Sequence, residues 1–372
     1  MSLYLWLFFL TAICAACGAN QKYEPCAYAF SFICLTAFLA LRYAQGADWP
    51  AYNYIFVSAP NKIDLSSIYY TDAFHSEIGW KLINNSWRSF GFNFTSLSVI
   101  VSLVEMVFLN RFLNRYSTNR ALSLLLTLPV VYLIYFFSAM RQGLVIAIFL
   151  GFMVPMLEKG HLGQYVLLDL LLATIHSVSL LLLIIPLFIK LKNKNIYLLI
   201  VICAILGIGL SPVLRAFVSL LGITYESSGI SPLALVYRLI MYSIVVMLYS
   251  GRKSVDEATE MLFKCYSSGL CIYLLFCSNE LMSSRFAAPQ MAIECALIAS
   301  LLRGQSKQGL ALLLCIITIC SVMYLKNIST VIDQSGYVKG VSAINYPYIS
   351  IFNSDDIFTY STNRYLPYLH WN

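Results

Sequence analysis

The chain has 372 residues, of which 60% are hydrophobic and 11% are charged, and its mean hydropathy is +0.76. Soluble globular proteins carry about 25% charged residues, so this chain has less than half of the usual solvating charge. Apolar runs recur along nearly the whole length, each close to the length that spans a bilayer. The numbers exclude a nucleic-acid-binding protein, a cytosolic enzyme fold and a disulfide-stapled secreted module. They predict an all-α polytopic membrane protein, with residues 1–372 forming a single integral membrane domain.

The apolar runs predict about 11–12 transmembrane segments. The net charge of +7 fits this class, because Lys and Arg accumulate in the cytoplasmic loops of membrane proteins. Four short basic loops, around Arg111–Arg120, Lys190–Lys194, Arg252–Lys253 and Arg303–Lys307, mark that side. The predicted spans are 3–18, 26–44, 93–110, 121–139, 142–157, 164–189, 196–211, 232–250, 260–278, 286–302 and 308–326.

The run 164–189 decides the topology of the second half of the chain. As one straight helix, its 26 residues would measure about 39 Å, which is too long for one crossing and short for two. Counted as one crossing, it would move the later basic loops outside. We therefore expect a broken helix hairpin that turns near His176. This places both termini, the loop 45–92 and the tail 327–372 on the outer side of the membrane.

Arginines on or near the outer face are unusual, because basic residues are normally depleted there. Each could snorkel to lipid headgroups, but several on one face favour a site for a polyanionic ligand, since guanidinium groups match phosphate and diphosphate geometry. Arg141 is confined to a tight turn in FFSAMRQGLVIAIF, and Arg238 lies about two turns inside a span. The outer arginines are Arg42, Arg88, Arg141, Arg215, Arg238 and Arg285.

Three residues are candidates for a general base. His176 lies where the broken hairpin should turn, and an imidazole suits proton transfer near neutral pH; it could equally be a structural histidine. Asp169, seven residues earlier, could orient the imidazole or pair locally. Asp48 and Glu77, in the first outer loop, could act as bases toward a hydroxyl or be ordinary solvated acids.

Aromatic residues are dense in segment 45–92 and in the tail, where Tyr52, Trp80, Tyr346 and Tyr348 are examples. They fit an interfacial aromatic belt and a saccharide-binding groove equally well. No DxD pair, P-loop, GxSxG or HExxH is present, so no metal, cofactor or nucleotide donor is predicted. Cys14 and Cys17 form a CxxC on an apolar helix, where thiols act as small hydrophobes.

The order of several short motifs resembles a known family. Gly46, Asp48 and Tyr52 are followed by Glu77, Gly79 and Trp80. Then come the segment SAMRQGLVIAI, the pair His176–Ser177, the pair Arg285–Phe286 and a late NYPY. From residue 46 to about 348, this order resembles the EpsG-like branch of the Wzy-type polysaccharide polymerases. Ala47 and Trp49 depart from the residues usual beside the first aspartate.

The resemblance implies a GT-C-like glycosyltransferase in the bacterial inner membrane with a periplasmic active site. Its expected partners are undecaprenyl-diphosphate-linked repeat units, membrane lipid and a chain-length regulator protein. His176, Glu77 and Asp48 are the expected catalytic residues. A lipid-linked oligosaccharide transporter, an O-antigen ligase and a membrane O-acyltransferase stay open as alternatives. The residues expected to bind diphosphate or substrate are Arg141, Arg285, Arg238, Arg215, Gln142, Tyr52, Trp80, Tyr346 and Tyr348.

Overall fold

The computed structural model of the protein describes residues 1–371 apart from 62–75, 210–211, 214–215, 217–228 and 303–306. Within these residues the regular elements are all helices, and extended pairing is limited to two isolated bridges, Arg42–Ser350 and Tyr337–Ser361. The predicted all-α class is confirmed.

The helices follow the predicted apolar runs. The first half contains α1 (Leu3–Cys17), α2 (Glu24–Ala40), α3 (Trp49–Ser58), α4 (Ile78–Ser89), α5 (Phe94–Tyr116), α6 (Arg120–Thr127), the π-helix η2 (Leu128–Phe136), α7 (Met140–Ile148), the π-helix η3 (Phe149–Met153), α8 (Val154–Glu158) and α9 (Leu162–Ala173). The second half contains the 3₁₀-helix η4 (Ser177–Ile184), α10 (Ile185–Ile189), α11 (Asn193–Gly209), α13 (Pro232–Ser250), α14 (Glu257–Leu275), α15 (Glu280–Met291), α16 (Glu294–Leu302), α17 (Lys307–Gln334), η5 (Ser354–Asp356), α18 (Ile357–Tyr360) and η6 (Leu366–Trp371).

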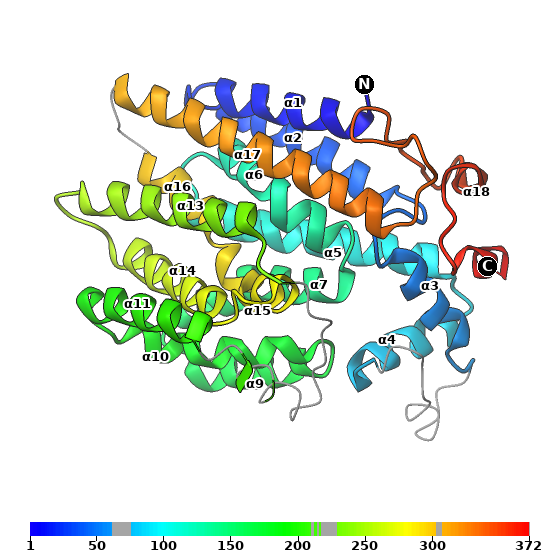
Figure 1. Ribbon diagram of the computed structural model, residues 1–372, viewed down its shortest axis with the longest axis horizontal. Coiled ribbons are helices and arrows are strands. Elements are labelled where there is room, and N and C mark those ends of the chain that lie inside the picture. Colours follow the sequence, from blue (N-terminus) through cyan, green and yellow to red (C-terminus); the bar gives the residue numbers. More distant parts are fainter. Residues whose placement is uncertain (62–75, 210–211, 214–215, 217–228, 303–306, 372) are drawn as a thin grey trace.

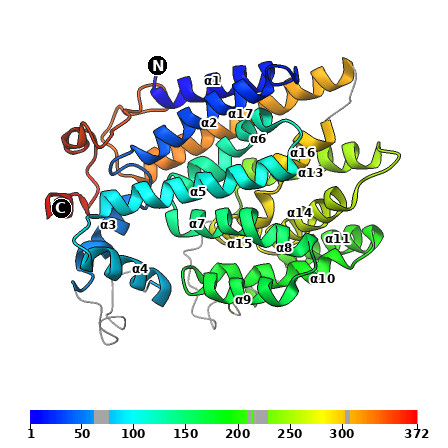
Figure 2. The same cartoon turned by 180° about the vertical axis from the view of Figure 1, so that it is seen from behind.

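The long helices lie side by side, and both termini, α3, α4 and the C-terminal tail gather at one end of them (Figures 1 and 2). A separate apolar cluster holds this end together: the buried rings of Trp49 and Trp80 pack there with Phe94 at the start of α5 and Met140 at the start of α7. The two segments predicted to share one side of the membrane therefore do lie together.

Among the described residues, those of the basic loops lie at the opposite end (Figures 1 and 2). The Arg252 guanidinium donates to the carbonyls of Ser300 and Leu301 at the end of α16, over 3.0 and 2.9 Å. Asn193, at the start of α11, contacts the hydroxyl of Tyr249 near the end of α13. This clustering agrees with the prediction that the basic loops share one side of the membrane.

Four helices among the described residues are long and apolar enough to cross a membrane: Phe94–Tyr116, Met140–Glu158, Pro232–Ser250 and Ala311–Gln334. The bent pair α15 and α16, with 50° between its halves, makes a fifth when counted as one span. The other predicted spans correspond to shorter or less apolar helices. The polytopic class is confirmed, while only four or five of the predicted 11–12 segments have full bilayer-spanning length.

The predicted broken hairpin is confirmed. α9 ends at Ala173, and after a short turn η4 packs back along it. The Tyr165 hydroxyl donates to the carbonyl of Leu182 over 2.7 Å, which joins the two arms. His176 stands at the turn, at the N-terminus of η4 and in an extended conformation.

Candidate functional site

The segment before α3 places Asp48 against the turn that precedes α7. Gly46 has φ +98°, and a Cβ there would lie 2.5 Å from the carbonyl oxygen of Phe137, so only glycine fits. The buried Arg42 fixes the same turn by donating to the carbonyls of Phe136 and Phe137, each over 3.1 Å. Arg42 is therefore a structural residue, which corrects its inclusion among ligand-binding outer arginines.

Arg141 is positioned by the first turn of α7. Ala139 has a non-helical conformation, with φ −98° and ψ 64°, so the helix begins at Met140 and projects Arg141 from its end. Arg141 Nη1 lies 2.7 Å from Glu77 Oε2, and 16% of the arginine side chain is exposed. The guanidinium carbon lies 5.5 Å from the ring centroid of Tyr52, a cation–π contact.

A close approach between α4 and the hairpin turn brings Glu77 to His176. The Gly79 amide donates to the carbonyl of Thr174 over 2.6 Å, and a Cβ on Gly79 would lie 2.3 Å from Thr174 Oγ1. Glu77 Oε1 then lies 3.3 Å from His176 Nδ1 and accepts hydrogen bonds from the amide and hydroxyl of Ser177, over 3.0 and 3.1 Å. The glycine in the EIGW motif thus makes this contact possible.

The surroundings of Glu77 keep it ionised. Burial alone would raise the pKa of Glu77, but the hydrogen bond with His176 and the charge of Arg141 lower it to about 2. Such a carboxylate is a weak proton acceptor at neutral pH. It can instead orient the imidazole through Nδ1, as the acid of a catalytic triad does. No group in the described part of the chain hydrogen-bonds His176 Nε2.

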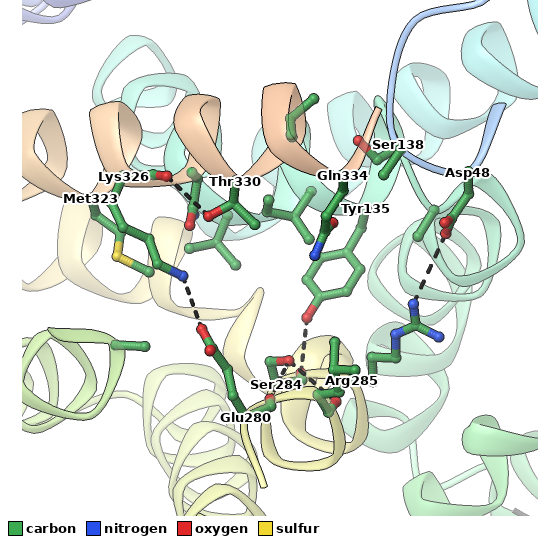
Figure 3. Close-up of a pocket in the computed structure, with 18 of the residues that line it drawn as sticks. Asp48, Tyr135, Ser138, Glu280, Ser284, Arg285, Met323, Lys326, Thr330 and Gln334 are labelled. Carbon is green, nitrogen blue, oxygen red and sulfur yellow. Dashed lines mark hydrogen bonds and ion pairs between the residues drawn. The ribbon is translucent and has the colours of Figure 1, made fainter. Parts of the chain in front are cut away.

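A cavity of about 310 Å³ opens beside this cluster. Its walls come from η2, α13, α15, α17 and the segment at Asp48. Figure 3 shows Asp48 and Arg285 at one end, with 4.0 Å between Asp48 Oδ2 and Arg285 Nη2. Lys326 and Glu280 meet at the other end, with 2.9 Å between Nζ and Oε1. The volume lies at the lower end of the ~300–1,000 Å³ typical of small-molecule sites.

Tyr52 lies within electrostatic reach of both the cluster and the Asp48–Arg285 end of the cavity. Burial raises the pKa of Tyr52, the charge of Asp48 raises it further, and the charges of Arg141 and Arg285 lower it. All three charged groups are therefore close enough to act on one phenol. Trp80 is fully buried and packs edge-on against Tyr52 with 5.7 Å between the ring centroids. It supports Tyr52 rather than offering a face to sugar.

Gln142 connects the two halves of the site. Its side-chain amide donates to the backbone carbonyl of Arg285, which ties α7 to α15. The predicted site residues Asp48, Glu77, Arg141, His176 and Arg285 are thus brought together from five separate parts of the chain.

Arg238 has a different environment from Arg285, although both line the cavity. Its guanidinium lies 3.6 Å from Glu294, and the two side chains are only 7% and 6% exposed. The hydroxyls of Tyr237 and Tyr266 donate to the same carboxylate. Arg238 is held in the floor of the cavity. Arg215 lies outside the described residues.

The two tail tyrosines do not line the cavity. Tyr346 is buried and stacks on Tyr4 with 4.4 Å between the ring centroids. Tyr348 stacks on Phe38 at 4.3 Å, and its hydroxyl donates to the carbonyl of that residue. Both attach the tail to α1 and α2, so the structure gives them a packing role.

Of the two roles that the sequence left open for Asp169, the structure does not show the one of orienting His176. Asp169 is buried, and its carboxylate oxygens have no hydrogen-bond partner in the part of the chain that the structure describes. Glu77 orients His176 instead, from 99 residues away. Sequence reasoning also left out Glu280 and Lys326, for which the available indication was ionisable residues in or beside apolar spans.

The comparisons with known proteins give one family match. No curated protein and no solved structure is detectably similar to the chain. The model of the EpsG family matches residues 26–348. This range contains the cluster at Glu77, both ends of the cavity and the broken hairpin. A match over most of the length assigns the family, and the resemblance read from the motifs is confirmed: the chain belongs to the EpsG family.

Proposed function

We propose that this protein is a glycosyltransferase that polymerises a lipid-linked polysaccharide. Membership of the EpsG family supports a polysaccharide-polymerase-type membrane protein in general. The observation that carries the specific proposal is the Arg141–Glu77–His176 cluster close to the end of a cavity that is lined by Asp48 and Arg285. An orienting carboxylate, a histidine with one unengaged nitrogen and two arginines suit transfer from a diphosphate to a hydroxyl.

The proposed donor is the growing glycan on undecaprenyl diphosphate. Its first sugar carbon is bonded to a phosphate oxygen, and when that bond breaks the electron pair stays on the diphosphate. Arg141 and Arg285 neutralise the charge that develops there, the kind of electrostatic stabilisation that is usually the largest catalytic contribution. Because guanidinium groups bind phosphate through paired hydrogen bonds, no metal is required in this scheme.

The proposed acceptor is a hydroxyl on the non-reducing end of a second lipid-linked repeat unit. Its oxygen attacks the sugar carbon as the bond to phosphate breaks, and its proton moves to His176 Nε2. Glu77 holds the ring through Nδ1 and stabilises the imidazolium that forms. The products are a glycan longer by one repeat unit and undecaprenyl diphosphate, with the proton on the histidine.

Both substrates are amphipathic, so the reaction belongs at a membrane surface. The site lies at the end of the helices where both termini, α3 and α4 gather, opposite the basic loops (Figure 1). Since basic loops mark the cytoplasm, we propose that this end faces the periplasm of the bacterial inner membrane.

The experiment is complementation of a strain that lacks the gene for this protein. We expect that strain to carry surface glycan as single repeat units, and the wild-type gene to restore long chains. Arg141→Ala should fail to restore them at normal protein level, while Arg141→Lys should restore them partly, because an ammonium lacks the forked geometry.

The matched control is Arg115→Ala. Arg115, in the last turn of α5, also pairs with a glutamate, since its Nη2 lies 2.9 Å from Glu158 Oε2. This ion pair lies at the end of the helices that carries the basic loops, away from the proposed site. Full activity of Arg141→Ala would overturn the proposed role of this arginine. Loss of all surface glycan in the deletion strain, with repeat units accumulating inside the cell, would favour the transporter alternative.

A further inference from the structure

We propose that Glu280 and Lys326, at the end of the cavity away from the reaction centre, form a subsite that recognises sugar hydroxyls of the lipid-linked repeat unit. The inference rests on the proposed function and adds a specificity-determining pair to it. No residue of the reaction centre described above belongs to this pair.

The pair lies within the predicted depth of the membrane, but it is exposed to the cavity. Lys326 is eight residues from the end of the span Ala311–Gln334, which is about 12 Å along a helix. Yet the side chains of Lys326 and Glu280 are 26% and 32% exposed. Ionisable groups within a membrane are costly and are usually found facing a cavity or a pathway. Here the cavity itself exposes them.

The neighbouring pair Arg238–Glu294 shows what a structural ion pair looks like in this protein. It is almost fully buried, and two tyrosine hydroxyls complete the hydrogen bonding of its carboxylate. Within the described residues, the side chains of the pair Lys326–Glu280 make one polar contact, between Nζ and Oε1. An ammonium has three hydrogens to donate and a carboxylate has two oxygens. Each group therefore keeps hydrogen-bonding capacity that faces the cavity.

The chemistry of the pair fits a hydroxyl-rich ligand. A sugar hydroxyl both donates and accepts, so neighbouring hydroxyls can bond to the carboxylate and to the ammonium together. Each end of the cavity carries one cation and one carboxylate, but Arg141 adds a second cation near Asp48 and Arg285, so a diphosphate is better suited to that end. The pyrophosphate group belongs near Arg285, at the other end of the same cavity (Figure 3). The charges thus orient a sugar diphosphate along the cavity.

Other polar groups extend the subsite. Gln334, on the same helix as Lys326, directs its amide into the cavity, and Tyr135 lies between the two charged ends (Figure 3). The face of α17 that carries Lys326 and Gln334 is therefore the side of the cavity that would bind and distinguish the sugar.

The test measures binding with two probes. The first is undecaprenyl diphosphate, and the second is the lipid-linked repeat unit purified from a strain that lacks this protein. Both are titrated into detergent-purified protein. We expect the wild type to bind the repeat unit at least about tenfold more tightly, since hydrogen bonds to charged groups are stronger than those between neutral groups.

Three variants separate recognition from structure. In Glu280→Gln and Lys326→Met, the preference for the repeat unit should fall toward one, while affinity for undecaprenyl diphosphate stays within about twofold. The double variant Glu280→Lys/Lys326→Glu restores an ion pair but exchanges donors and acceptors, so it should not restore the preference. The matched control exchanges Glu260 and Lys264, an ion pair at 2.8 Å on α14, and should bind as the wild type does.

Each result decides the inference. Normal preference in the exchanged double variant would overturn it, because the pair would then be structural. Equal affinity of the wild type for both probes, or normal preference in both single variants, would also overturn it. Failure of the proposed function would look different: the purified wild type would make no polymer from the repeat unit, whatever the binding preference.

Discussion

Glu77 holds the site together, since it contacts Arg141, His176 and Ser177 at once. From the sequence, Glu77 is a candidate base. In the structure, Arg141, His176 and Ser177 lower its pKa, so the carboxylate is ionised at neutral pH. We assign proton transfer to His176 and positioning to Glu77. Asp48, paired with Arg285 across 4.0 Å, stands at the cavity end where the diphosphate is proposed to bind.

The proposed role of Glu77 depends on its negative charge and not on its shape, and this can be tested. Glu77→Gln keeps the shape but removes the anion, so we expect polymer formation to fall about 10²–10⁴-fold, the range of a lost general-base contribution. Polymer length and rate in membranes of the variant measure this. The matched control is Glu158→Gln, which removes the arginine-paired glutamate at the other end. A Glu77→Gln variant with normal rate would remove Glu77 from the mechanism.

The low pKa of Glu77 also gives a pH dependence of stability. In the folded protein it is about 2, below the ~4.3 of an unperturbed glutamate. The stabilisation by the ionised group is therefore fully present above about pH 4.3 and is lost as the pH falls toward 2. We expect Glu77→Gln to melt below the wild type at pH 7, with the difference shrinking below pH 4. An unchanged difference at pH 3 would contradict this.

The elements around the site depend on two close contacts at glycine. Gly46 lets the segment before α3 pack on the turn at Phe137, and Gly79 lets α4 pack on the hairpin turn at Thr174. Neither contact can be inferred from periodicity, but both glycines belong to the motifs that carried the family resemblance.

Gly79→Ala should therefore disable the enzyme without touching a catalytic group. The added methyl would meet backbone and side-chain atoms of Thr174, moving Glu77 away from His176. Displacements of about 1 Å can cost about 10²-fold in rate, and we expect a loss of that order. Gly163→Ala is the matched control. Gly163 lies on the same hairpin, and a Cβ added there would meet no atom within 4 Å. Equal polymer yield from the two variants would show that the contact at Gly79 is dispensable.

The sequence predicted some elements well and others poorly, for physical reasons. The hairpin was predictable because a run of 26 apolar residues suits neither one crossing nor two. The number of full-length spans was not, because several apolar helices, among them Leu3–Cys17, Glu24–Ala40 and Arg120–Phe136, are shorter than a full span. Asp169 seemed to be the partner of His176 only if the helix continued through residue 176. The break removes that shared face and opens the ring to Glu77.

Side-chain burial was the other unpredictable property. Arg42 and Arg88 looked like outer-face cations, yet each donates to backbone carbonyls, Arg88 to those of Val57 and Ala59. Tyr346 and Tyr348 looked available to sugar but pack on α1 and α2. Composition predicts that such residues lie at the interface, whereas only tertiary contacts decide which way they face.

At the scale of the whole molecule, the site and the basic loops lie at opposite ends of the helices. Single cysteines replacing Lys194 and Lys339, both exposed, in a cysteine-free background would report the two ends. We expect a membrane-impermeant thiol reagent to label position 339 from the periplasm and position 194 only after permeabilisation. Labelling of both from outside would contradict the hairpin topology in the membrane.

The central claim is that His176 takes the acceptor proton in glycosyl transfer. The most direct measurement compares wild type, His176→Ala and the control His161→Ala, an exposed histidine at the start of α9, as purified proteins supplied with lipid-linked repeat units. We expect His176→Ala to bind the repeat unit as tightly as the wild type and to polymerise it about 10²–10⁴-fold more slowly, with His161→Ala normal in both. Polymerisation by His176→Ala at the wild-type rate would contradict the account.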